Sequence, residues 1–306
     1  MNRKTFQRML AALVPVIPLL FFMTSVARGS TGVLLTVKGD VIVTVNRVSQ
    51  PAKTGFRVGP GAKVVSRGGS VTLLLSDGKA HTVRDGASYT LPGDEPEEGP
   101  DPLILGLMDV LRELVSRGKA PSTEPEPRAE TEIPAFYPCN SLVPPGEIRF
   151  EWEPAAGAES YEINLRAPLP AYAYSFVTGS AEGRAVLPKE APPLLPGIRY
   201  YWKVRPSGTL GDEAFSSALH WFALLEPGEE VRRRLESERL RRVEGLDEES
   251  RGILTACHLT AYGLYHEGVN LFLRRLRSHP EDAGARELLR GIYGKMNKPE
   301  GLGKVK

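Results

Sequence analysis

The hydrophobic pattern of this chain changes character along its length, and that change constrains the fold more than any other feature. Residues 31–92 and 136–225 carry short runs in which apolar and polar residues alternate, as in half-buried strands. Between them lies PSTEPEPRAETE (121–132), which has no large apolar residue. After Pro227 apolar residues recur every three or four positions, as in helices. The sequence therefore predicts a multidomain, mainly β protein with an α-helical C-terminal hairpin.

Residues 1–27 have the pattern of an export signal. Arg3, Lys4 and Arg8 precede an uncharged apolar run at 9–27, which ends on the small-x-small triplet SVA (25–27). The run approaches the length of a membrane span, so an uncleaved anchor is the alternative to a cleaved signal, and only then would this segment contact a membrane. Because no later stretch could span a bilayer, we expect the rest to be periplasmic or otherwise extracytoplasmic.

The chain is almost neutral once this segment is set aside. Its formal net charge of +2 includes the three cations of the predicted signal. The arginines at 232–234 lie among glutamates, which is typical of a solvated helix face. We expect no nucleic-acid partner, because such binders usually carry a basic face or stripe.

Cys139 and Cys257 are the only cysteines. An oxidising compartment would permit a disulfide between them. They are far apart in the sequence, however, and two separate, inert thiols are the alternative.

Residues 28–95 predict a small all-β module. Its alternating runs are broken by turns expected at Gly39-Asp40, at residues 59–61 and at Asp77-Gly78. The strings VKGDV (37–41), GFRVG (55–59) and GSVTLLLSDG (69–78) resemble the FecR-like domain family, although this chain has Gly-Pro-Gly where the family usually has Gly-Asp. The resemblance implies a β-roll of the periplasm or cell surface, used in envelope signalling and assembly, without catalytic residues.

Residues 102–117 predict an amphipathic helix, because leucines recur at spacings of three and four. Its apolar stripe either caps an edge of the preceding β-module or binds a partner or a membrane surface. Leu107 and Leu111 are the candidate contacts for a partner. Residues 118–134 are rich in Pro and Glu and predict an extended linker, which should leave the β-modules separable.

Residues 135–225 predict a second β-module. Phe150 and Trp152 alternate with charged residues, and the strings GAESY (157–161) and LPGIRYYWKV (195–204) resemble fibronectin type III-like modules. The resemblance implies a β-sandwich, in which large rings fill the space between two sheets. Tyr172, Tyr174 and Trp221 are candidates for glycan stacking, with packing in the core or at its rim as the alternative.

Residues 227–306 predict a helical tail. Residues 229–244 are mostly Arg and Glu and indicate an exposed connector. LYHEGVNLF (264–272), followed by HPED (279–282), resembles the second helix and exit turn of a tetratricopeptide repeat, with Gly268 at the position where helices pack closely. Only about one and a half repeats fit, which favours a short hairpin that docks on another protein. The candidate contacts in the tail are Leu264, Phe272 and Tyr293.

We find no catalytic or metal-binding motif in the sequence. His266-Glu267 begins like a zinc-protease helix, but Asn270 stands where the second His is required. We therefore expect a non-enzymatic protein without a cofactor, which binds another envelope protein as a scaffold or assembly factor. The alternatives are a cell-wall or polysaccharide-binding protein and a FecR-like regulator of envelope signalling.

Overall fold

The computed structural model describes residues 29–93, 99–118, 133–179, 182–207 and 216–297. The predicted export signal and residues 119–132 of the predicted linker lie outside these residues. The described part holds sheets of six, five and three strands together with five helices, so the protein combines β and α structure. One described helix covers residues 102–118, where the sequence predicts an amphipathic helix, and the other four lie within residues 227–295. None of the described helices is long and apolar enough to cross a membrane.

The first sheet is built on two long antiparallel strands, β1 (Gly32–Val45) and β4 (Lys63–Leu75). The strand order is β2-β1-β4-β5, with β3 paired to β1 and β6 paired to β4. The shorter strands are β2 (Val48–Pro51), β3 (Arg57–Val58), β5 (Ala80–Arg84) and β6 (Ser88–Thr90). One face of the sheet encloses a valine-rich cluster that includes Leu34, Val43 and Leu73. Val33, Leu35 and Leu74 belong instead to a larger core, which also contains residues of the helices. Because both faces are covered, β1 begins with five consecutive buried residues.

The turn expected at Gly39-Asp40 is wrong, because β1 runs straight through these residues. The chain reverses later, at Asn46 and Arg47, where both φ angles are positive. Gly39 lies opposite Gly69 on β4, and a Cβ at Gly39 would lie 1.9 Å from the Gly68 carbonyl oxygen. The glycine therefore allows β1 and β4 to approach closely and does not make a hairpin. The hairpin predicted at Asp77-Gly78 is confirmed, since it joins β4 to β5.

Two further sheets form the second β-region. The five-stranded sheet has the order β11-β10-β13-β14-β8, and the three-stranded sheet has the order β12-β9-β7. Rings from the two sheets contact each other, with centroids 4.9 Å apart for Phe150 and Trp202 and 5.1 Å apart for Trp152 and Tyr161. The strands are β7 (Ala135–Tyr137), β8 (Ser141–Val143), β9 (Arg149–Trp152), β10 (Ser160–Ala167), β11 (Tyr172–Thr178), β12 (Arg184–Val186), β13 (Arg199–Ser207) and β14 (His220–Leu224).

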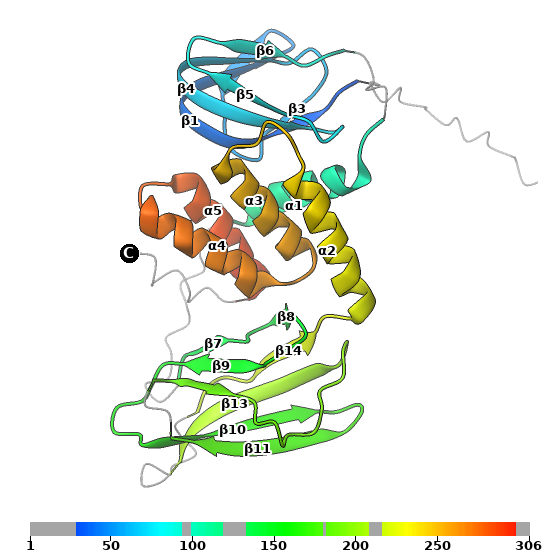
Figure 1. Cartoon of the computed structure of the whole chain (residues 1–306). Coiled ribbons are helices and arrows are strands. Elements are labelled where there is room, and N and C mark those ends of the chain that lie inside the picture. The colour runs from blue at the N-terminus through cyan, green and yellow to red at the C-terminus, as the bar shows by residue number, and fades with distance from the viewer. Residues whose placement is uncertain (1–28, 94–98, 119–132, 180–181, 208–215, 298–306) are drawn as a thin grey trace, which may run out of the picture.

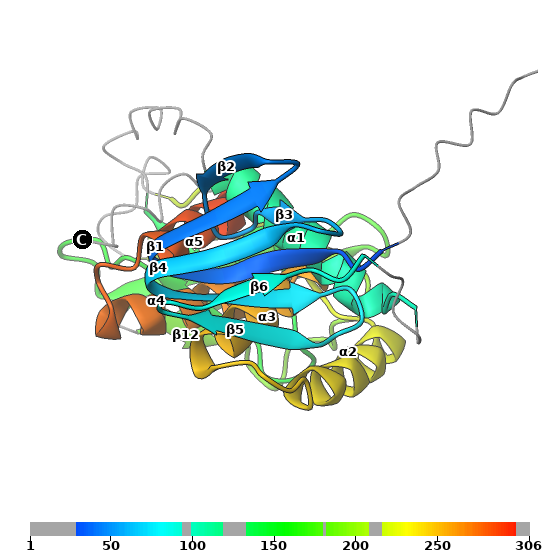
Figure 2. The same cartoon turned by 90° about the horizontal axis from the view of Figure 1, so that it is seen from above.

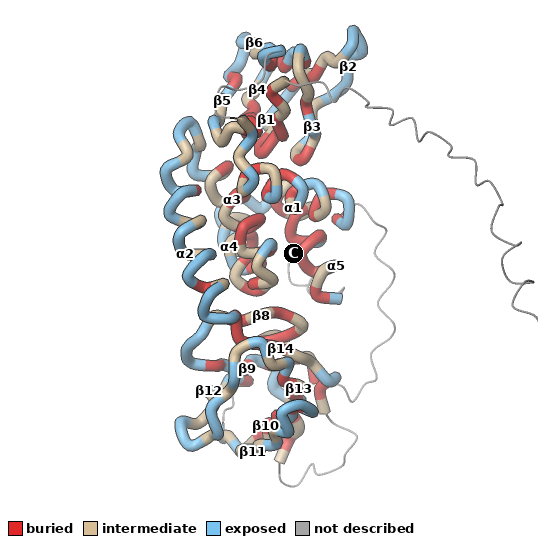
Figure 3. The backbone as a smooth tube through the Cα atoms, turned by 90° about the vertical axis from the view of Figure 1, so that its right-hand side faces the viewer, coloured by how far each residue is buried: buried red, intermediate tan, exposed pale blue. Residues whose placement is uncertain are grey.

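The helices form a layer between the two β-regions (Figure 1). They are α1 (Pro102–Gly118), α2 (Pro227–Arg241), α3 (Glu248–Ala261), α4 (Tyr265–Ser278) and α5 (Ala283–Lys295). Seen from above, the first sheet lies across α1, α3 and α5 (Figure 2). Helix α2 is the outermost, and among its side chains only Glu230 and Leu240 are buried, as expected of an exposed connector (Figure 3).

Helix α1 joins this layer although the whole second β-region separates it from α2 to α5 in the sequence. A Cβ at Gly291 of α5 would lie 2.2 Å from the Leu114 carbonyl oxygen, so the two backbones nearly touch. Lys295 forms an ion pair of 2.6 Å with Glu113 of α1. On its other side α1 packs against the first sheet, where Val115 approaches Gly55. The apolar stripe of α1 thus covers its own β-module and also receives a helix from the far end of the chain.

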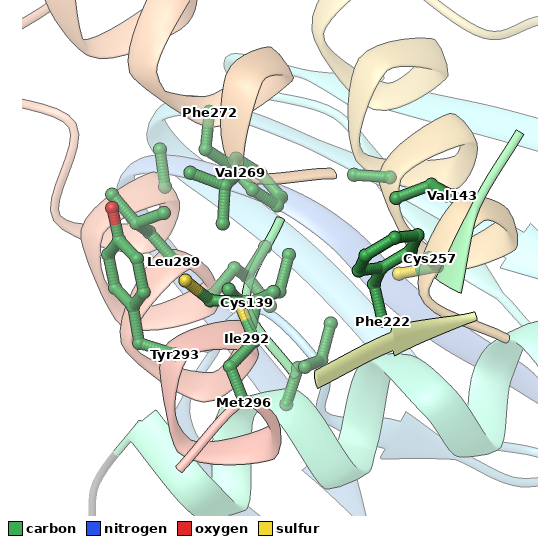
Figure 4. Close-up of a cluster of buried hydrophobic side chains, with 14 of the residues drawn as sticks. Cys139, Val143, Phe222, Cys257, Val269, Phe272, Leu289, Ile292, Tyr293 and Met296 are labelled. Atoms are coloured by element: carbon green, nitrogen blue, oxygen red, sulfur yellow. The ribbon is translucent and has the colours of Figure 1, made fainter. Parts of the chain in front are cut away.

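The helical layer shares one hydrophobic core with both β-regions. This core runs from Val33 in β1 through Leu111 and Ile292 to Phe222 in β14. In Figure 4 the side chains of Val143 and Phe222 lie together with those of the helices. The prediction that the β-regions are separable modules on a linker therefore needs correction, because the helices bury apolar surface of both.

Candidate partner-binding cleft

The segment between β7 and β8 fastens the second β-region to the helices. The Cys139 N–H donates to Nε2 of His266 on α4 over 2.9 Å. The side-chain amide of Asn140 donates to the Met296 carbonyl at the end of α5 over 2.8 Å. From the five-stranded sheet, the indole N–H of Trp202 on β13 donates to the Pro138 carbonyl over 2.6 Å. These bonds fix the distance between the three-stranded sheet and α4.

A cleft of about 690 Å³ lies in the resulting angle between the sheet and the helices. We call it the acidic cleft. One wall comes from β7, β9 and the loop before β9, and the other comes from α4 and the end of α5. The wall of the β-region consists of residues 135–137, 144–147, Arg149, Glu151 and Glu153, and the helical wall consists of His266, Glu267, Val269, Asn270, Leu273, Tyr293 and Met296.

The two walls follow from the periodicities of their elements. In β9 the buried Phe150 and Trp152 point into the core, so the alternate residues Arg149 and Glu151 face outward. On α4, Glu267, Asn270 and Leu273 lie three residues apart and therefore share one face. A strand face and a helix face of a rigid core thus oppose each other across the cleft.

Carboxylates dominate the charge of the cleft. Four glutamates line it, and the single arginine, Arg149, is engaged with Glu147 through a bond of 2.9 Å. Within the described part of the chain, Glu151 and Glu153 form no ion pair. Glu151 and Glu153 are not among the site residues expected from the sequence. Their signal is present in the sequence, since Glu151 and Glu153 are two residues apart and so lie on the same strand face as Arg149.

Glu267 is the most unusual of these groups. One of its carboxyl oxygens is buried and has no hydrogen-bond partner among the described residues. Burial raises the pKa of this carboxyl above its ordinary value. Burial also raises the pKa of the neighbouring Tyr137 hydroxyl, and the charges of Glu267 and Glu151 add to that shift. The cleft therefore presents acceptor oxygens that a cationic or N–H-rich ligand would satisfy.

The five residues expected to contact a partner are buried instead in the protein's own interior. Leu107 and Leu111 of α1 are buried in the shared core, and Leu264 and Phe272 are at most 2% exposed. Tyr293 is also buried, although it forms part of the cleft floor. The hydrophobic stripes were detected correctly, but each stripe is already covered by another helix or sheet.

The three residues expected to stack on a glycan do not form one platform. Tyr172 and Tyr174 pair with the buried residues Ala167 and Leu165 across the ladder, so they point toward the space between the sheets. Tyr172 makes an edge contact with the buried Tyr200, with ring centroids 5.1 Å apart. Trp221 lies opposite Tyr201, next to Tyr200 along β13, and therefore on the other face of the same sheet.

Trp221 instead lines a second hollow, of about 540 Å³, between β14 and the helices. Tyr262 and Tyr265 line it with Trp221, together with charged residues of α2. The Arg199 guanidinium covers one face of Trp221 at 4.3 Å from the ring centroid. This aromatic hollow is separate from the acidic cleft.

Beside this hollow, a buried polar network connects α2 with α3. His258 Nε2 lies 3.1 Å from a Glu236 oxygen, which also accepts a hydrogen bond from the Tyr262 hydroxyl. Ser237 approaches the other ring nitrogen at 3.4 Å. Burial lowers the pKa of His258, and this effect is larger than the increase caused by the nearby Glu236 carboxylate. These hydrogen bonds hold the otherwise exposed α2 against α3.

The remaining candidate chemistry is limited in the described part of the chain. Cys139 and Cys257 are free and buried (Figure 4), and burial raises the pKa of the Cys257 thiol to about 12. Such a thiol is a poor nucleophile at neutral pH. Among the described residues, no group of three or more His, Cys, Asp or Glu side chains could hold a metal ion.

Comparison with known proteins gives no further guide. No protein-family model matches this chain, and no curated protein matches it.

Proposed function

We propose that this protein is a non-enzymatic, exported scaffold or assembly factor of the cell envelope, and that its acidic cleft binds a basic, extended segment of an envelope protein. The export pattern of residues 1–27 supports the location. The motifs of residues 28–95, 135–225 and 227–306 support FecR-like, fibronectin type III-like and tetratricopeptide-like regions, all of which are common in binding proteins. The chemistry of the cleft supports the kind of partner.

One observation carries this proposal: carboxylates without ion-pair partners line a preformed cleft between two rigid walls. Glu151 and Glu153 are exposed at its rim, and Glu267 has an unpartnered oxygen deeper inside. Lysine or arginine side chains of a bound segment would pair with the rim and donate to Glu267. Pro144, Pro145 and Tyr137 add apolar surface against which an extended chain can pack.

The experiment places a photo-crosslinking residue at Asn270, an exposed residue in the helical wall, and exports the protein in its native host. The expected product joins the cleft to a lysine- or arginine-bearing segment of one envelope protein. The double variant Glu151→Lys, Glu153→Lys should reduce that product by about tenfold, because it places positive charge at the rim. The matched control is Glu159→Lys, Glu190→Lys, which changes the net charge equally at exposed positions outside the cleft.

A crosslink that survives the cleft variant as well as it survives the control would contradict the proposal. So would a product mapped to an acidic or purely apolar segment. Raising the salt concentration should weaken formation of the product, since exposed charge pairs are screened.

The aromatic hollow favours a second candidate, a cell-wall or polysaccharide-binding function. Trp221, Tyr262 and Tyr265 come together there from three elements, and stacking on such rings is a common way to bind sugars. Retention on insoluble peptidoglycan that is lost in Trp221→Ala, but kept in Tyr174→Ala, would identify this function. A role as a FecR-like regulator of envelope signalling rests on the motifs of residues 28–95 alone.

A further inference from the structure

The edge strands of the described sheets differ in how well they are protected against pairing with another chain. Strand β8, at one end of the five-stranded sheet, has only three residues and is covered by the helices, because the Leu142 N–H donates to the Gly263 carbonyl. In the other sheets, β2 ends in Pro51, β5 carries Arg84, and β7 and β12 have three residues each. Short strands, prolines, charges and covering helices are the usual means by which proteins prevent edge-to-edge association.

Strand β11 has none of these protections. It forms the other end of the five-stranded sheet and pairs only with β10 among the described strands. Its seven residues, YAYSFVT, include no charge, proline or glycine and are rich in residues that favour strands. Ala173, Ser175 and Val177 are exposed on one face, and Val177 is 62% exposed.

We propose that β11 is a self-association site, at which two copies of this chain pair antiparallel across a two-fold axis through Ser175. In this register Ser175 lies opposite Ser175 of the second copy, and Ala173 lies opposite Val177. Tyr174 then lies opposite Phe176 on the inner face. The two five-stranded sheets become one continuous sheet. Among the described strands each copy has one such edge, so the assembly closes at a dimer.

Charge and position on the molecule favour a second copy as the occupant. The strand is uncharged and the chain is almost neutral, so two copies bring no like charges together. β11 also lies at the end of the molecule away from the helical layer (Figures 1 and 3), so two copies can meet end to end without contact between their helices. Both acidic clefts stay open, which makes this proposal independent of the proposed function.

The test is sedimentation equilibrium of the exported protein over a wide concentration range, together with the variants Ser175→Lys and Ser175→Asp. The unchanged protein should show a reversible monomer–dimer equilibrium. Each variant alone should dissociate about fivefold more readily, because its two like charges face each other at the axis. An equimolar mixture of the two variants should recover the dimer as a mixed pair. Gln50→Lys, which adds the same charge to the exposed edge strand β2, is the control and should leave association unchanged.

The recovery in the mixture separates loss of pairing from loss of folding, since a misfolded variant would not recover. A monomer at every concentration would overturn the proposal. Variants that associate as well as the unchanged protein, or a mixture that fails to recover, would also overturn it. Larger oligomers would do the same, because a single shared edge closes at two copies.

Discussion

At the scale of single residues, the junction between the second β-region and the helices is held by buried polar groups that the sequence does not mark. His266 looks like half of a metal motif in the sequence, but in the structure its Nε2 accepts a hydrogen bond from the Cys139 N–H. Asn140 has a positive φ of 49° and bonds the end of α5. Its role depends on contacts across more than a hundred residues of chain, which no local pattern reveals. In the acidic cleft, Glu267 has a buried carboxyl oxygen without a hydrogen-bond partner among the described residues.

Glu267→Gln should raise the thermal midpoint at neutral pH. Burial raises the folded-state pKa of Glu267 above its ordinary value of 4.5. At pH values between the ordinary and the folded pKa, the folded protein holds a proton that the unfolded chain has released. The contribution of this group to stability is therefore lost as pH rises from 4.5 through the folded pKa. Glutamine does not ionise, so it avoids that loss.

The measurement is a series of thermal melts from pH 4 to neutral pH. The advantage of Glu267→Gln should shrink as the pH falls below 4.5, the ordinary pKa. Glu153→Gln, an exposed change at the rim of the same cleft, is the control and should show little effect at any pH. An advantage of equal size at every pH would rule out burial of the carboxylate as its cause.

At the scale of elements, local signals predicted the elements well and their neighbours poorly. The leucine stripe at 102–117 predicted α1 almost to the residue, because a helical period is a local property. The stripe could not reveal that α5 covers it, since that contact depends on Gly291 and on chain far away. The glycines show the same limit. Gly78 makes the predicted hairpin, whereas Gly39, which also has a positive φ, allows a close contact between strands.

Gly268→Ala and Gly291→Ala form a matched pair with different expected outcomes. Both glycines are buried inside helices, and alanine gains about 1 kcal/mol of helix propensity at either site. At Gly268 the new Cβ would meet the flexible end of Ile292 at 3.1 Å, so the change should be neutral or stabilising. At Gly291 it would meet the α1 backbone at 2.2 Å, so the change should lower the free energy of unfolding by about 1–3 kcal/mol.

Denaturant melts of the two alanine variants and of Gly268→Leu test this prediction. Leucine at 268 should lower the free energy of unfolding by about 1–3 kcal/mol through overpacking against α5. If Gly268→Leu raised stability, α4 would not be packed at this point. If Gly291→Ala raised it, the close crossing of α1 and α5 would be wrong.

At the scale of the whole molecule, two distant stretches of chain build one helical layer, and this layer holds the two β-regions together. The sequence predicted strand-rich regions on either side of a Pro- and Glu-rich stretch, with a docking hairpin at the end. The apolar surface of the C-terminal helices is present, but the chain's own α1 and first sheet cover it. The acidic cleft depends on the contact between the second β-region and the C-terminal helices, since one of its walls is β9 and the other is α4.

The shared helical layer is tested most simply by cutting the chain between α1 and β7 and measuring whether the two fragments stay together. A specific protease site placed within residues 119–131 is cleaved, and the product is run on size exclusion under native conditions. The account predicts that the two fragments elute together at the size of the intact chain, because α1 stays packed between the first sheet and α5, and that they separate only in denaturant. Fragments that elute apart without denaturant would contradict the packing of α1 against α5, and with it the shared helical layer.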